Sequence, residues 1–200
     1  MSHRSARSPA RCLGTTIAAL LAPLALVGWL VAPAPASAQE TATDKSSAGT
    51  PEERLAALGI ELPTPPPPVA NYVKAVRTGN LVFLAGHGPL KPDGTYVTGR
   101  LGDDLSLEEG YEAARLTAIA LLASLKAEIG ELSRVKRIVK VHGMVNSDPA
   151  FTDQPKVING CSDLLVSIFG DQGKHARAAV GMASLPMGIA VEIEMVVEVE

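Results

Sequence analysis

Three short stretches of the sequence carry residue types that could take part in chemistry. The first is the run 85–89, in which glycines flank a histidine at the expected end of a strand. Gly86 would let a ligand approach the backbone closely, and the imidazole of His87 can donate or accept a proton near neutral pH. The more common role of such a run is a bulge or turn.

The second and third stretches would supply opposite charges. Arg177 precedes the small residues 178–183, and its guanidinium can direct two hydrogen bonds onto a carboxylate. The last expected strand, 189–199, carries Glu192 and Glu194 at alternate positions, which is typical of a strand with one solvated face. A glutamate on a strand next to Arg177 could instead act as a general base, or could form an interface salt bridge with it.

Most other catalytic patterns are absent from the sequence. It has no G-x-S-x-G, H-E-x-x-H, P-loop or G-x-G-x-x-G motif. His87, His142 and His175 lack the spacing of metal ligands, so we expect no metal site. We expect His142 to be hydrogen-bonded within a strand and His175 to be solvated. Cys161 lies on the apolar stripe of an expected helix, which favours a buried, unreactive thiol.

Strand and helix signals alternate along the body of the chain. Alternating patterns and turn residues predict strands at 72–76, 81–85, near 96–97, 135–145, 176–184 and 189–199. A capping box at 106–109 predicts a helix that ends at Gly130, and a second apolar stripe predicts a helix from near Asp153 to Gly170. Alternation within 135–145 places Val139 and Val141 on one face. We therefore predict an α+β fold, a mixed β-sheet with two α-helices packed on one face.

The first fifty residues differ in composition from the rest. Three arginines precede an apolar run from 13 to 31 and the small-residue triplet 36–38, which is the pattern of a signal peptide. We predict cleavage after Ala38, and an uncleaved membrane anchor is the alternative. The predicted organisation is a signal peptide at 1–38, a flexible tether at 39–50 and one domain at 51–200. The mature protein would be secreted, or periplasmic in a Gram-negative host, with no membrane contact after cleavage.

A short helix at 51–58 is expected to precede a proline-rich run. Pro63 and the run 65–68 force an extended polyproline segment. The commoner role of such a segment is a stiff connector along the surface of a domain, although similar runs also bind aromatic grooves on other proteins.

The charge of the chain argues against a nucleic-acid partner. Its formal net charge is −3, and three of its 18 basic residues but none of its 21 acidic residues lie in 1–38, so the body is more acidic than the whole. An acidic body with no basic stripe lacks the electrostatic footprint of a nucleic-acid binder.

The stretch 71–198 resembles the RidA/YjgF family, also labelled endoribonuclease L-PSP or chorismate mutase-like. The resemblance rests on NYVKAVRTGN at 71–80, on the helix 105–130, and on the tail 177–194, which is similar to R-S-x-V-x-V-x-x-L-P-x-x-x-x-V-E-I-E. The run 153–160 looks typical of a chorismate mutase-like branch. The resemblance implies a chorismate-mutase-like homotrimer with ligand clefts at its subunit interfaces. It also implies hydrolysis of 2-aminoacrylate and related imines to 2-oxo acids and ammonia.

The resemblance also assigns roles to particular residues. Arg177 takes the place of the arginine that holds the substrate carboxylate, and Glu192 matches the glutamate that positions the attacking water. Tyr72 matches an aromatic residue of the cleft wall. Gly86 and the backbone around Ala178 and Ala179 match the groups that hold the carboxylate and the imine. A protonated imine is already electrophilic, so these groups suffice without a metal or another cofactor.

The sequence departs from the family pattern at several of these positions. The usual S-G-Q is Ala85-Gly86-His87 here, so His87 stands where a cleft glutamine is expected. Ala178 replaces a serine and Ala179 a common cysteine. Asn159 resembles a helix residue near the cleft in some members, or is an ordinary exposed asparagine.

Several functions remain open on these observations. The first is an exported imine or enamine deaminase centred on Arg177 and Glu192, and the second is a non-catalytic trimer that binds small carboxylates. A ribonuclease is disfavoured by the acidic body. A chorismate mutase would need several cations around a dicarboxylate, of which the sequence identifies only Arg177.

Overall fold

The computed structural model describes residues 49–68 and 70–200 of the 200-residue chain. The predicted signal peptide at 1–38, its cleavage after Ala38 and most of the tether at 39–50 lie outside the described residues, so the domain organisation stays a prediction. Within the two described ranges, no helix is both long and apolar enough to cross a membrane.

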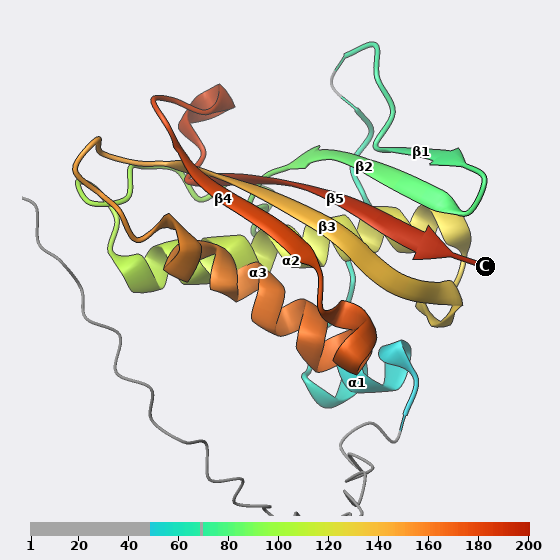
Figure 1. The fold of residues 1–200 in the computed structure, drawn as a ribbon. Coiled ribbons are helices and arrows are strands. Elements are labelled where there is room, and N and C mark those ends of the chain that lie inside the picture. Colours follow the sequence, from blue (N-terminus) through green and yellow to red (C-terminus); the bar gives the residue numbers. More distant parts are fainter. Residues whose placement is uncertain (1–48, 69) are drawn as a thin grey trace, which may run out of the picture. The chain divides into compact units, whose positions relative to one another are not determined.

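Five strands form one mixed sheet (Figure 1). They are β1 (Ala75–Thr78), β2 (Leu81–His87), β3 (Val135–Asn146), β4 (Ala176–Met182) and β5 (Val191–Val199), in the order β1-β2-β5-β3-β4. Neighbouring strands are antiparallel except β3 and β4, which run parallel. A parallel pair needs a crossover connection, and the chain between β3 and β4 supplies it as a helix.

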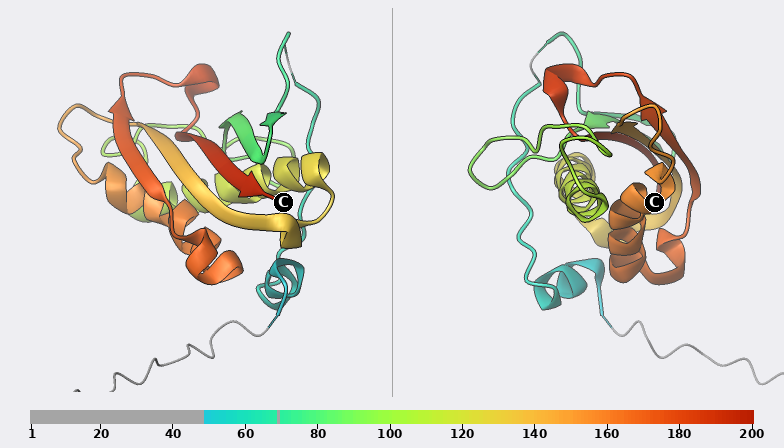
Figure 2. Two further views of the ribbon diagram at one scale, coloured as in Figure 1. Left: turned by 45° about the vertical axis from the view of Figure 1, so that its right-hand side comes forward. Right: turned by 90° about the vertical axis from the view of Figure 1, so that its left-hand side faces the viewer.

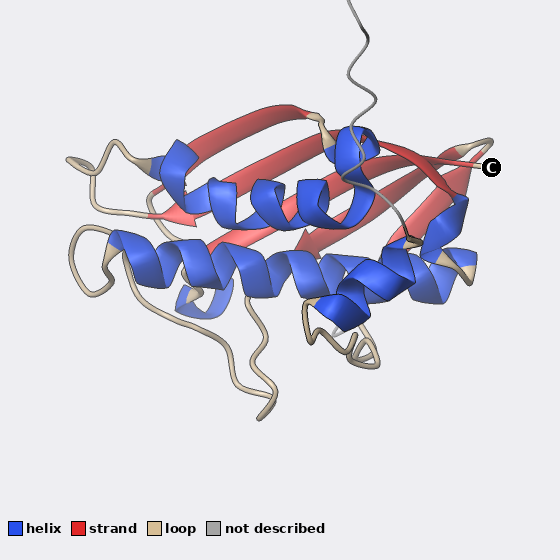
Figure 3. Cartoon of the chain, turned by 90° about the horizontal axis from the view of Figure 1, so that it is seen from below, coloured by secondary structure: helices blue, strands red, loops and turns tan. Residues whose placement is uncertain are grey.

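Two helices, α2 (Leu107–Ile129) and α3 (Gln154–Phe169), lie side by side on one face of the sheet (Figures 2 and 3). The predicted α+β fold is confirmed. Helix α2 begins at the predicted capping box, in which the hydroxyl of Ser106 accepts from the backbone N–H of Glu109. It ends at Gly130, which has a positive φ of 87°. Gly160 brings the two helices into close contact, because a Cβ at this position would overlap the carbonyl oxygen of Tyr111 on α2.

A third, short helix, α1 (Pro51–Ala57), begins at a capping box on Thr50 and packs against α3. The guanidinium of Arg54 donates to the carbonyl of Ile168 at 2.9 Å. The carboxylate of Glu52 accepts from the backbone N–H of Leu132 at 2.7 Å. These contacts fix the chain to the domain immediately before the proline-rich segment.

The strand predictions differ from the structure by one to three residues at most strand ends, and in larger ways elsewhere. Strand β1 begins at Ala75 rather than at residue 72, because the tight turn at 79–80 fixes the register and pairs Ala75 with Leu84. The region near 96–97 forms isolated bridges and no strand. In β3, a register shift between Ile138 and Lys140 buries Ile138 and leaves Val139, which was predicted to share a face with Val141, only half-buried.

The face of the sheet opposite the helices carries a mixture of charged and apolar side chains. Strand β5 alternates as predicted, with buried Val191, Ile193 and Met195 toward the helices and Glu192 and Glu194 on the other side. Large apolar side chains are also exposed on this open face: Val76 (54%), Phe83 (44%) and Val180 (39%).

Candidate functional site

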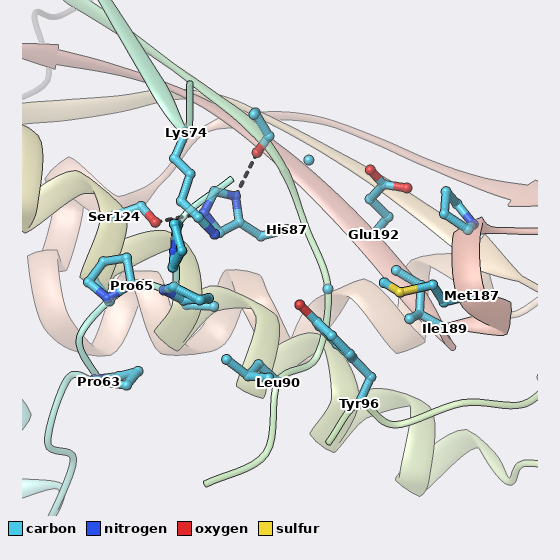
Figure 4. A pocket seen from close by; sticks show the side chains of 18 of the residues that line it. Pro63, Pro65, Lys74, His87, Leu90, Tyr96, Ser124, Met187, Ile189 and Glu192 are labelled. Carbon is cyan, nitrogen blue, oxygen red and sulfur yellow. Dashed lines mark hydrogen bonds between the residues drawn. The ribbon is translucent and has the colours of Figure 1, made fainter. Parts of the chain in front are cut away.

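A cavity of about 440 Å³ lies against the bulged end of β2 (Figure 4). Four of the eight predicted site residues line it: Tyr72, Gly86, His87 and Glu192. The proline-rich segment forms one wall, and Leu90, Tyr96 and Ile189 contribute further apolar surface. The polyproline segment therefore runs along the domain surface, as predicted for a connector, and also shapes a cavity.

His87 is buried at this cavity and both of its ring nitrogens are bonded. Nδ1 lies 2.7 Å from the carbonyl oxygen of Ala85, and Nε2 lies 2.7 Å from Oγ of Ser124 on α2. A carbonyl only accepts, so Nδ1 carries the proton and Nε2 accepts from the serine. Burial lowers the pKa of His87, and the positive charge of Lys74 lowers it further. His87 is thus a neutral part of the cavity with no free nitrogen for a ligand.

Glu192 lies on the other side of β2, next to Gly86. A Cβ at Gly86 would overlap the carboxylate oxygen Oε1 of Glu192, so only glycine leaves room for this carboxylate at the cavity. Burial raises the pKa of Glu192, and the negative charge of Glu194 raises it further. A carboxylate with a raised pKa is a suitable group for accepting a proton from water.

Lys74 also lines the cavity and was not among the site residues predicted from the sequence. Its side chain points inward beside His87 (Figure 4), and burial lowers the pKa of its ammonium group. A signal for it was present in the sequence, because Tyr72 and Lys74 are two residues apart and side chains alternate along an extended chain.

The remaining predicted site residues gather around Arg177, on the edge strand β4. The guanidinium nitrogen Nη1 of Arg177 donates to Oδ1 of Asn159 at 2.8 Å and to Oγ of Ser162 at 3.0 Å, both on α3. Asn159 is therefore a partner of the arginine. Ser162 is also 3.1 Å from Nε2 of His175, whose Nδ1 bonds the carbonyl of Gly173 at 2.7 Å. The predicted solvated His175 is wrong, since this residue is half-buried and orients Ser162.

Arg177 and Glu192 are not brought together within one chain. Strand β3 lies between β4 and β5, so the expectation of a glutamate on a strand next to Arg177 is wrong. The register also places them on opposite faces, with Arg177 toward α3 and Glu192 on the open face. Glu194 lies 3.5 Å from His142 instead of pairing with the arginine.

The two alanines next to Arg177 lie on different faces of β4. Ala179 packs partly against the helical core, whereas Ala178 pairs with His142 on the open face. Cys161 is fully buried on α3, and burial raises the pKa of its thiol to about 12, which suits the predicted unreactive cysteine. In the described part of the chain, no three histidine, cysteine or acidic side chains gather as metal ligands.

One chain thus carries two separate groups of candidate residues. The cavity can hold a small molecule beside a carboxylate, and the Arg177 group can hold an anion in a fixed orientation.

Comparison with known proteins relates this chain to one family. A family model described as "YjgF/chorismate_mutase-like, putative endoribonuclease" matches residues 52–199. Protein TCP17 of Trypanosoma cruzi is 46% identical over 145 residues, which cover 72% of this chain and 91% of that protein. The 2-iminobutanoate/2-iminopropanoate deaminase of Dermatophagoides farinae is 30% identical over 142 residues, which cover 70% of this chain and 95% of that protein.

A solved structure gives the same result at the level of the fold. The protein Atu1372 of Agrobacterium tumefaciens, whose function is unknown, is 43% identical and superposes with a TM-score of 0.71, over 75% of this chain and 92% of that one. The sequence resemblance, the family model and the fold agree. The chain belongs to the YjgF/chorismate mutase-like family.

Proposed function

We propose that this protein is an exported, homotrimeric deaminase that hydrolyses 2-imino acids and the related enamines to 2-oxo acids and ammonia. The observation that carries the proposal is the separation of two complementary groups in one chain. Glu192 lines a cavity, whereas Arg177 is held in place at the edge strand β4. A second copy of the chain would supply the group that each cavity lacks.

The open face of the sheet supports assembly into such an oligomer. Val76, Phe83 and Val180 expose a large part of their side chains there. Burial of apolar surface stabilises an interface by roughly 25 cal/mol per Å² removed from water. Exposed apolar side chains on one sheet face are therefore consistent with a face that contacts neighbouring copies.

The chemistry needs only groups that the chain provides. Arg177 of one copy binds the substrate carboxylate, and Glu192 of the next accepts a proton from water as the water oxygen bonds to the imine carbon. The resulting carbinolamine loses ammonia when the proton returns to nitrogen and the carbon–nitrogen bond breaks. The hydroxyl proton then leaves as the 2-oxo group forms. Holding the reactants in this orientation supplies much of the rate acceleration.

Two further observations support the substrate and the location. The mite relative, which is 30% identical, is named a deaminase of 2-iminobutanoate and 2-iminopropanoate. The N-terminal pattern supports export with cleavage after Ala38. N-terminal sequencing of the protein from the producing cells tests this part, since the mature chain should begin at Gln39.

The decisive experiment measures imine hydrolysis by the purified protein. An amino-acid oxidase generates the imine of alanine in situ, and semicarbazide traps the imine that the protein has not hydrolysed. The 2-oxo acid formed by hydrolysis before trapping is measured. We expect Arg177→Ala and Glu192→Gln each to lower kcat/KM by about 100-fold or more. Ser167→Ala, at an exposed position of α3, is the matched control and should retain activity.

Mixing the two inactive variants tests whether the site spans two copies. When Arg177→Ala and Glu192→Gln chains are co-expressed, random trimers should regain about a quarter of the wild-type activity, because one intact cavity then meets one intact arginine at about one interface in four. No recovery would place both groups in a single-chain site. Absence of hydrolysis in the wild type would overturn the deaminase.

A non-catalytic carboxylate-binding trimer is the second candidate. It is favoured by His87, both of whose ring nitrogens are bonded within the protein, so that the cavity has one fewer group able to transfer a proton. It predicts that 2-oxobutyrate binds wild-type protein, that binding is lost in Arg177→Ala, and that no imine is hydrolysed.

A further inference from the structure

The cavity contains a cation that the proposed reaction does not use. Lys74 is half-buried, and its side chain points into the cavity beside His87 and Ser124 (Figure 4). In residues 49–68 and 70–200, no carboxylate lies within ion-pair distance of its ammonium group. We propose that Lys74 binds a second anionic group of the ligand, so that this cavity selects 2-imino acids with a side-chain carboxylate. The inference rests on the proposed function for the 2-imino part of the ligand.

Neighbouring residues do not supply the missing negative charge. His87 is neutral, and its proton on Nδ1 is donated to the carbonyl of Ala85. Ser124 is uncharged and donates to Nε2 of the same histidine. Burial without a partner disfavours a charged group, and burial lowers the pKa of Lys74 accordingly. An anion arriving with the ligand would offset this cost.

Glu192 is the carboxylate of the cavity, but it lies across β2 from the lysine. The backbone carbonyl of Lys74 accepts from the N–H of Ala85 on one side of this strand, and Glu192 contacts Gly86 from the other. Their backbones are therefore two strand spacings apart, about 10 Å. A ligand placed between them can present its imine carbon to Glu192 and a distal group to Lys74.

The other walls direct a ligand anion toward Lys74. Pro63 and the prolines at 65–67 have no N–H to donate, and Leu90 and Ile189 are apolar. Lys74 is the one lysine or arginine among the described residues that line the cavity. An anionic side chain bound here would therefore meet one positive charge, that of Lys74, together with the hydroxyls of Tyr72 and Tyr96.

The size of the cavity also favours an extended ligand. Its volume is about 440 Å³, and a water molecule takes up about 30 Å³ in the liquid. A three-carbon imino acid has six non-hydrogen atoms and would leave most of this space to water. A five-carbon dicarboxylate has ten and extends farther along the cavity.

The test compares substrates that differ only in charge. Imines of glutamate and of glutamine are generated in situ, because their side chains have nearly the same shape and differ as carboxylate and carboxamide. We expect wild-type kcat/KM to be at least about tenfold higher for the glutamate imine. In Lys74→Gln this preference should disappear. Lys136→Gln, at an exposed position of β3, is the matched control.

A binding measurement separates this inference from the deaminase proposal. Calorimetry with 2-oxoglutarate and 2-oxobutyrate needs no catalysis, and we expect the dicarboxylate to bind wild type more tightly and to lose this advantage in Lys74→Gln. If the dicarboxylate binds in this way but no imine is hydrolysed, the role of Lys74 is supported and the deaminase proposal is overturned. Hydrolysis of the alanine imine with equal use of glutamate and glutamine imines would overturn the role of Lys74 and leave the deaminase in place. Equal binding of both acids would also overturn it.

Discussion

His87 and His175 lie near opposite edges of the sheet and are held in the same way. Each donates from Nδ1 to a backbone carbonyl two residues earlier, and each bonds through Nε2 to a serine on a helix beneath the sheet, Ser124 on α2 and Ser162 on α3. Burial lowers the pKa of both imidazoles, and a neighbouring cation lowers each further. Two distant regions thus pair a neutral histidine with a positive charge.

The cations themselves differ in how firmly they are held. Ser162 accepts from Arg177, and Asn159 adds a second hydrogen bond, so the guanidinium has a fixed orientation. Lys74 has no such partner in the described chain and can follow its ligand. A planar, oriented arginine suits a carboxylate that must sit at a fixed distance from the reacting carbon. A flexible lysine suits a distal group whose position varies.

Among substitutions that test these two regions, Gly86→Ala is expected to have the largest effect on activity. The new Cβ would displace the carboxylate of Glu192, which is the end of a flexible side chain and can move without unfolding the protein. We expect kcat for the alanine imine to fall about 100-fold, since a displacement of about 1 Å suffices for such a loss. Thermal unfolding should be nearly unchanged.

Gly181→Ala is the matched control for this variant. Its Cβ would also meet the tips of polar side chains, those of Gln154 and Ser147, but on β4 and away from the cavity. It should retain activity. Equal losses in the two variants would mean that the position of Glu192 does not matter.

An intermediate effect is expected from Asn159→Ala, which removes one of the two hydrogen bonds that orient the guanidinium of Arg177. Losing one charge-assisted hydrogen bond to Arg177 should raise KM about tenfold and change kcat little, because the arginine holds the carboxylate equally in the ground and transition states. Asn159→Asp, which retains the acceptor, should restore KM. A variant with wild-type KM would show that the orientation of Arg177 does not depend on α3.

The smallest effect concerns the pH dependence of stability. The pKa of His87 is lowered in the folded state, so the unfolded chain takes up the proton more readily, and stability falls as the pH drops below about 6.5. In His87→Gln this part of the loss of stability at acidic pH should disappear.

His175→Gln provides the comparison for the second region. The pKa of His175 is also lowered, and the two sites are far apart. The acid-induced loss of stability that disappears in the double variant should therefore equal the sum of the losses that disappear in the two single variants. Chemical denaturation at several pH values measures this. Parallel curves for wild type and the double variant would contradict the assignment of neutral histidines.

Local sequence signals predicted most of the fold. The capping box at Ser106, the glycine at 130 and the alternation of β5 each report a local preference that the sheet and helices retain. The errors lie where a contact distant in sequence decides the structure. The bulge near Ile138 depends on pairing with β5, and local alternation does not contain that information.

The candidate site was less predictable, because its geometry depends on the order of the strands. The resemblance identified Arg177 and Glu192 but could not show that β3 separates their strands. Lys74 carries no motif, and its importance depends on a cavity wall formed by residues 63–67. Ser162 was missed for the same reason, since its role is to link His175 with Arg177.

The proline wall restricts the conformational freedom of one side of the cavity. Each proline ring restricts φ, and the contacts of Arg54 with α3 on one side and of Lys74 with β2 on the other hold both ends of the segment. A loop that closed over a ligand would lose about 1–2 kcal/mol of conformational entropy per ordered residue. Here part of that loss is already made during folding, so ordering this wall around a ligand should cost less entropy than ordering a flexible loop.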